Sequence, residues 1–147
     1  MTRVYQMPSR PAADSPRPFI LVVDDERRIA DTLVMILKSK GYVAEAAHDA
    51  ATALAICRQR VPDLVISDVV IPGTNGIELA IAISRQFPRC HILLFSGQAE
   101  TAEILEDANR RGYDFELLAK PLHPEELLTR IKELIGPHDT RQQEGRR

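Results

Sequence analysis

Side chains that could bind a metal ion and a phosphoryl group recur directly after short apolar runs of the sequence. Each run has four or five residues, and the residues that follow supply three carboxylates, one hydroxyl and one ammonium. Two carboxylates 4 Å apart repel by about 4 kcal/mol at an effective dielectric near 20, so a cluster of them needs a proton or a cation. No His or Cys lies close to the carboxylates in their motifs, and oxygen ligands select a hard ion such as Mg²⁺. The five residues are Asp24, Asp25, Asp68, Ser96 and Lys120.

The same side chains could transfer a phosphoryl group. A carboxylate can act as a nucleophile towards phosphorus and form an aspartyl phosphate. A metal ion and a lysine ammonium would neutralise the oxygens of the transferring group, and a serine hydroxyl would donate a hydrogen bond to one of them. This chemistry requires a fold that brings all of them together.

Apolar runs alternate with helical patterns through most of the chain. This alternation predicts an α/β fold, a doubly wound five-stranded parallel sheet with five helices and the flavodoxin-like order 2-1-3-4-5. The carboxyl ends of parallel strands open onto one edge, where ligands bind in such sheets. The expected strands are 19–24, 42–47, 63–67, 91–95 and 115–119, and the expected helices are 26–40, 49–60, 75–87, 99–111 and 124–136.

Turn and capping signals divide these elements. A loop is expected over 68–75, because it contains Pro72 and Gly73. Asn75, with Glu78 three residues later, resembles a capping box that opens the third helix.

Composition places the chain among ordinary globular proteins. It has 147 residues, 44% of them hydrophobic and 27% charged, which is enough for one domain with a buried core. The net charge of −2 makes nucleic-acid binding unlikely as a function. No apolar stretch is long enough for a membrane helix or signal peptide, and Cys57 and Cys90 stand alone. We expect a cytoplasmic protein with reduced thiols and no membrane partner.

Both ends of the sequence differ from its centre. Residues 1–17 are rich in proline and arginine without periodicity and are expected to form a disordered leader, and 137–147 a polar tail. The region 18–136 is expected to be the single domain. The 11 residues after Gly136 are too few for an effector domain, so output is expected to pass through a separate, unknown downstream protein.

The motifs within 18–136 resemble the receiver domains of two-component response regulators, at segments 21–26, 68–76, 95–97 and 119–121. The resemblance implies that Asp68 is the phosphoacceptor. It also implies that Asp24, Asp25 and Asp68 bind Mg²⁺ together with the backbone carbonyl of Val70.

The resemblance further implies that Ser96 tracks the phosphoryl group and that Lys120 pairs with it. The phosphodonor would be a phosphohistidine on a histidine kinase or a histidine phosphotransfer protein. The protein would then be a phosphorylation-dependent switch in a two-component or phosphorelay pathway. Such a protein assists its own phosphorylation and dephosphorylation and is not an enzyme.

One position departs from the family pattern. The family usually carries an aromatic residue three positions before the lysine, and its rotation reports phosphorylation, whereas this chain has Leu117 there. Either Phe115, two residues earlier, takes over through a bulge, or the aromatic half of the switch is missing. We expect the fourth helix and its preceding loop to carry the signal.

Two other functions compete with the switch. An aspartyl-phosphate phosphohydrolase of the haloacid dehalogenase type needs a second Asp two residues after the nucleophile, and this position is Val70. A nucleotide- or flavin-binding module would need a glycine-rich phosphate loop, which the sequence lacks.

Overall fold

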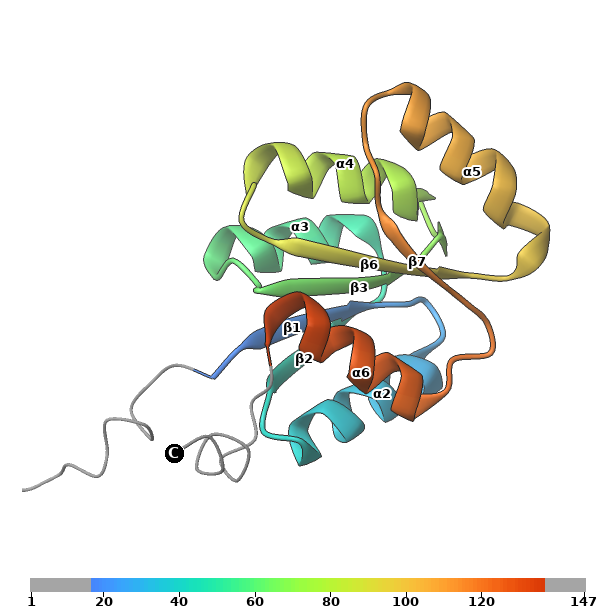
Figure 1. The fold of residues 1–147 in the computed structure, drawn as a ribbon. Coiled ribbons are helices and arrows are strands. Elements are labelled where there is room, and N and C mark those ends of the chain that lie inside the picture. The colour runs from blue at the N-terminus through green and yellow to red at the C-terminus, as the bar shows by residue number, and fades with distance from the viewer. Residues whose placement is uncertain (1–16, 137–147) are drawn as a thin grey trace, which may run out of the picture.

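A five-stranded parallel sheet forms the centre of the molecule (Figure 1). The computed structural model describes residues 17–136, except for the side chains of residues 98–101; the expected tail, and the expected leader apart from Arg17, lie outside this range. The strand order β2-β1-β3-β6-β7 is the predicted order 2-1-3-4-5. The strands are β1 (Phe19–Val23), β2 (Val43–Ala47), β3 (Leu64–Asp68), β6 (His91–Ser96) and β7 (Glu116–Ala119).

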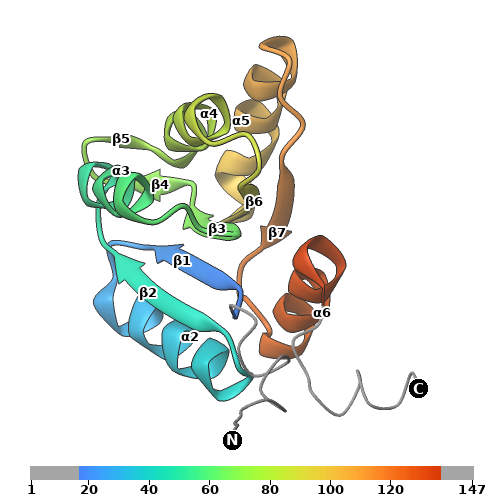
Figure 2. The ribbon, with the colours of Figure 1, turned by 90° about the vertical axis from the view of Figure 1, so that its left-hand side faces the viewer.

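Helices cover both faces of the sheet, as the doubly wound prediction requires (Figure 2). α3, α4 and α5 lie on one face, and α2 and α6 lie on the other. None of the helices in the described part of the chain is long and apolar enough to cross a membrane. Their bounds are α2 (Arg27–Ser39), α3 (Ala50–Gln59), α4 (Gly76–Gln86), α5 (Gln98–Arg110) and α6 (Pro124–Ile135).

The central strands are apolar on both faces because both faces are covered. In β1 every residue is buried, with Leu21 and Val23 in one core cluster and Ile20 and Val22 in the other. Each such side chain contributes about 1.5–3 kcal/mol when buried. The register pairs Val23 with Ser67 of β3, so the acidic residues that follow these two positions arrive side by side.

The segment after β3 contains a small hairpin, so the expectation of a loop over 68–75 was wrong for residues 70–71 and 74–75. β4 (Val70–Ile71) and β5 (Thr74–Asn75) pair in antiparallel fashion. Pro72 and Gly73 form the turn between them, and Gly73 has a φ of 85°. Proline followed by a glycine with positive φ is the pattern of a type II turn, which closes the hairpin.

The N-terminus of α4 is capped from one side only. The Asn75 side chain accepts a hydrogen bond from the Glu78 N–H at 2.8 Å, as the capping-box pattern predicted. The reciprocal half of the box is absent, because the Glu78 carboxylate binds the Arg111 guanidinium instead, at 2.5 and 3.2 Å. The cap holds the start of α4 against the end of β3.

Candidate functional site

The three predicted acidic residues meet at the carboxyl edge of the sheet. Asp24 and Asp25 follow β1, and Asp68 ends β3. One carboxylate oxygen from each lies within 4.8 Å of the others. Asp24 and Asp68 are buried, whereas Asp25 is exposed, so the cluster faces solvent on one side only. The three carboxylates could hold a metal ion.

The Asp24 carboxylate has an unsatisfied oxygen inside this cluster. Its Oδ1 accepts a hydrogen bond from the Glu26 N–H at 2.9 Å, but Oδ2 is buried without a partner. Burial raises the pKa of Asp24, and the charges of Asp68 and Asp25 add to this rise against the Glu26 hydrogen bond. A buried, unpaired carboxylate oxygen among other carboxylates suits a hard divalent cation, so these residues fit Mg²⁺.

Both oxygens of the Asp68 carboxylate are held. Oδ1 accepts from the Val70 N–H at 3.0 Å, and Oδ2 pairs with Lys120 Nζ at 2.7 Å. Partial burial works against the Lys120 charge, but the hydrogen bond to Asp68 and the charges of Asp68 and Asp24 outweigh it and raise the lysine pKa. Lys120 therefore stays an ammonium. Its backbone N–H donates to Ser96 O at 2.9 Å, which fixes where it leaves the sheet.

Ser96 and Val70 reach the same edge in different ways. Ser96 is fully buried at the end of β6, and its hydroxyl donates to the Gly97 carbonyl at 2.8 Å. Because a hydroxyl has one proton, Ser96 cannot donate to Asp68 at the same time. The Val70 side chain is exposed, while its N–H contacts Asp68. The metal-binding role of the Val70 carbonyl stays a prediction.

Two further residues support the site without having been singled out from the sequence. A Cβ atom on Gly76 would lie 2.3 Å from the Asp68 backbone oxygen, so only glycine lets α4 approach this closely. The His48 Nδ1 atom lies 2.9 Å from the Asp24 backbone oxygen. A glycine directly after the helix cap at Asn75 was the sequence feature that could have pointed to Gly76. No such feature exists for His48, because it is 24 residues from its partner in the sequence.

The aromatic residues before Lys120 form a stack in the segment that leads into β7. The rings of Tyr113 and Phe115 are parallel, with centroids 5.7 Å apart. Both rings, like Leu117, are partly buried against the core cluster on the face of the sheet that α3, α4 and α5 cover. Phe115 lies before the first residue of β7, so the structure shows no bulge that places it at the Leu117 position.

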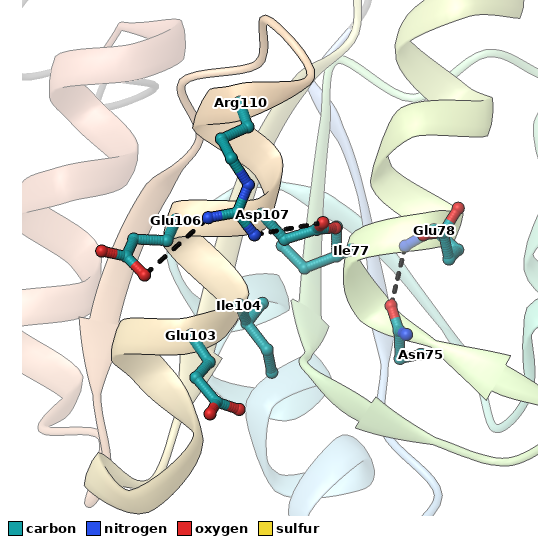
Figure 3. A pocket seen from close by; sticks show the side chains of 8 residues that line it. All are labelled: Asn75, Ile77, Glu78, Glu103, Ile104, Glu106, Asp107 and Arg110. Atoms are coloured by element: carbon teal, nitrogen blue, oxygen red, sulfur yellow. Dashed lines mark hydrogen bonds and ion pairs between the residues drawn. The ribbon is translucent and has the colours of Figure 1, made fainter.

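The described side chains of α5 bury little apolar surface, and a solvent-exposed ion pair links its C-terminal end to α4. Among its described side chains only Ala108 is buried. A pocket of about 470 Å³ separates α5 from α4, with Ile77 and Ile104 between acidic residues (Figure 3). Along the rim of this pocket Arg110 pairs with Glu106 and Asp107 of the same helix, at 4.0 and 3.7 Å. The ion pair to α4 is made by Arg111, directly after α5, with Glu78 at 2.5 Å. A helix held in this way can shift at low cost.

Comparisons with known proteins give one consistent result. The family model described as "Response regulator receiver domain" matches residues 20–132. Among curated proteins, the DNA-binding response regulator MtrA of Mycobacterium tuberculosis (strain CDC 1551 / Oshkosh) is 29% identical over 126 residues, 86% of this chain and 54% of that protein. MtrA of Mycolicibacterium smegmatis is 30% identical, over 81% of this chain and 51% of that protein. The chain thus spans about half the length of these curated relatives.

Solved structures agree with the family match. A CheY-like response regulator receiver domain protein from Methanospirillum hungatei superposes with a TM-score of 0.73 at 31% identity, covering 80% of this chain and 92% of that one. The receiver domain of NtrX from Brucella abortus gives 0.70 at 33% identity, covering 79% of this chain and 97% of that one.

Proposed function

Because the chain belongs to the response regulator receiver domain family, we propose that it is a phosphorylation-dependent switch in a two-component or phosphorelay pathway. The observation that carries this proposal is the environment of Asp68. Its buried carboxylate is paired with Lys120, and one of its oxygens lies within 4.8 Å of an oxygen from each of Asp24 and Asp25. Such an environment suits an aspartate that accepts a phosphoryl group.

In the proposed reaction, an oxygen of Asp68 attacks the phosphorus of a phosphohistidine. The new P–O bond forms as the P–N bond breaks, and the electron pair of the broken bond stays on the imidazole nitrogen of the donor. Lys120 then exchanges its bond to Asp68 for one to a phosphoryl oxygen. The Ser96 hydroxyl turns from Gly97 to donate to another, because a new dianion needs additional donors.

The proposed cofactor is Mg²⁺, held by Asp24, Asp25, Asp68 and the Val70 carbonyl. When bound, Mg²⁺ neutralises charge that develops on the phosphoryl oxygens. The chain's own contribution is to hold three carboxylates together against their mutual repulsion. The unpaired Asp24 oxygen supports this assignment.

The proposed phosphodonor is a histidine kinase or a histidine phosphotransfer protein. An apolar groove of about 630 Å³ between α2 and the segment after β7 supports a protein donor. Ile29 and Leu33 of α2 line the groove together with Pro121 and Leu122, and Lys120 is also among its lining residues. A donor seated there would place its histidine close to Asp68. We propose a cytoplasmic setting, where Cys57 and Cys90 stay reduced, and a protein as the downstream partner.

Incubation with acetyl phosphate and Mg²⁺ tests whether the protein is a switch or a hydrolase. We expect intact-mass measurement to show one added phosphate per chain, because one aspartate accepts it and no second Asp serves as general acid. Release of phosphate from diverse phosphate esters over many turnovers would instead support the phosphohydrolase and contradict the switch.

We also propose that the loop after β6 and α5 carry the signal, in place of an aromatic ring. The Phe115 ring is stacked on Tyr113, and a swing of this ring would break the stack. α5 has little apolar burial to hold it in place. With a phosphoryl mimic, hydrogen exchange should change over residues 96–111, in wild type and in Phe115→Ala alike. A Phe115→Ala protein that accepts phosphate but loses this change would identify Phe115 as the switch.

A further inference from the structure

We infer that His48 is a positioning residue for the metal site, an inference that rests on the proposed Mg²⁺-dependent function. His48 follows β2, on the neighbouring strand to β1, and is partly buried. Its Nδ1 atom lies 2.9 Å from the backbone oxygen of Asp24. A carbonyl oxygen only accepts hydrogen bonds, so His48 is the donor through Nδ1–H.

The group that His48 binds is the peptide unit between the first two acidic residues. The Asp24 carbonyl belongs to the peptide that joins Asp24 to Asp25. On the N-terminal side of this peptide, the Asp24 N–H donates to Ala47 O at 3.0 Å, and on its C-terminal side the Glu26 N–H donates to Asp24 Oδ1 at 2.9 Å. His48 supplies the side-chain donor that fixes the orientation of this peptide, and with it the direction in which both carboxylates leave the backbone.

Asp25 depends on this anchor more than its neighbours do. Within the described residues, no hydrogen bond or ion pair holds its exposed carboxylate, whereas Asp24 and Asp68 have such bonds. Repulsion from these two residues favours movement of Asp25 towards solvent. The position of Asp25 is therefore set by the backbone, which two side-chain contacts hold: Asp24 Oδ1 with the Glu26 N–H, and His48 Nδ1 with the Asp24 carbonyl. The His48 contact is the one that comes from a different strand connection and anchors this backbone to the rest of the fold.

The experiment compares the magnesium affinity of three variants with that of wild type by isothermal titration calorimetry. His48→Leu removes the donor, while His48→Asn keeps an N–H close to the position of Nδ1. His91→Leu is the matched control, because this histidine is exposed at the opposite edge of the sheet. Thermal unfolding in EDTA measures the fold without metal.

We expect His48→Leu to raise the Mg²⁺ dissociation constant about tenfold. Losing a hydrogen bond that orients a metal ligand weakens metal binding by about 10- to 100-fold, and the lower value is expected here. His48→Asn and His91→Leu should stay close to wild type, and all should unfold cooperatively in EDTA. An unchanged affinity in His48→Leu, or an equal loss in His48→Asn, overturns the role of this donor while the metal site stands. A wild type that binds no Mg²⁺ overturns the metal site and this inference together.

Discussion

Asp68→Asn should abolish the phosphoryl adduct that acetyl phosphate forms on the wild-type protein. The amide oxygen of asparagine carries no charge and is a weak nucleophile towards phosphorus. The substitution also removes the ion pair between Asp68 Oδ2 and Lys120 Nζ, so no carboxylate remains next to the lysine ammonium to accept the phosphoryl group. Intact-mass measurement after treatment with acetyl phosphate and Mg²⁺ should fall from one added phosphate to none.

A matched control separates this loss from a general effect of charge. Asp31→Asn makes the same chemical change on the exposed side of α2, and we expect it to accept phosphate like wild type. Circular dichroism should show that both variants are folded. Equal labelling of Asp68→Asn and wild type would mean that another residue is the phosphoacceptor.

Magnesium should stabilise the wild-type protein, and Asp25→Ala should remove this stabilisation. A ligand that binds only the folded state stabilises it by about 2.7 kcal/mol at 100 times its dissociation constant. For a domain of this size, the melting temperature should rise by roughly 10 °C. Asp25 is the exposed member of the cluster, so the variant keeps its core. Without metal it should be at least as stable as wild type, because one of three like charges is gone.

Differential scanning calorimetry with excess EDTA and with Mg²⁺ measures both effects on the same samples. Asp31→Ala, an exposed acid outside the cluster, should keep the full metal-induced shift. A shift of the same size in Asp25→Ala would show that Mg²⁺ binds elsewhere or without this carboxylate.

The strand order and the gathering of the site residues could be predicted from the sequence. Runs such as 19–23 are apolar throughout, which is typical of parallel strands covered on both faces. Parallel strands place their carboxyl ends on one edge, so residues that follow successive strands meet there without any knowledge of side-chain packing. Asp24, Asp68 and Lys120 were predicted together for this reason.

The hairpin after β3 and the single-sided cap of α4 depended on contacts that local patterns do not contain. Pro72 and Gly73 specify a turn, but the sequence does not show that the residues on its two sides pair, or that α4 then starts in close contact with the Asp68 backbone. Glu78 had the spacing of a capping box, yet Arg111, 33 residues later, competes for its carboxylate. A charge-assisted pair across two elements prevailed over the local hydrogen bond.

The sequence by itself determined the architecture and the chemical types at the edge of the sheet, because hydrophobic periodicity and residue identity are local properties. Only the tertiary structure decided which atoms of those residues are satisfied. It placed His48 against the Asp24 carbonyl and left one Asp24 oxygen without a partner. These contacts join residues on different strands or depend on the burial of single atoms, and both follow from packing in three dimensions.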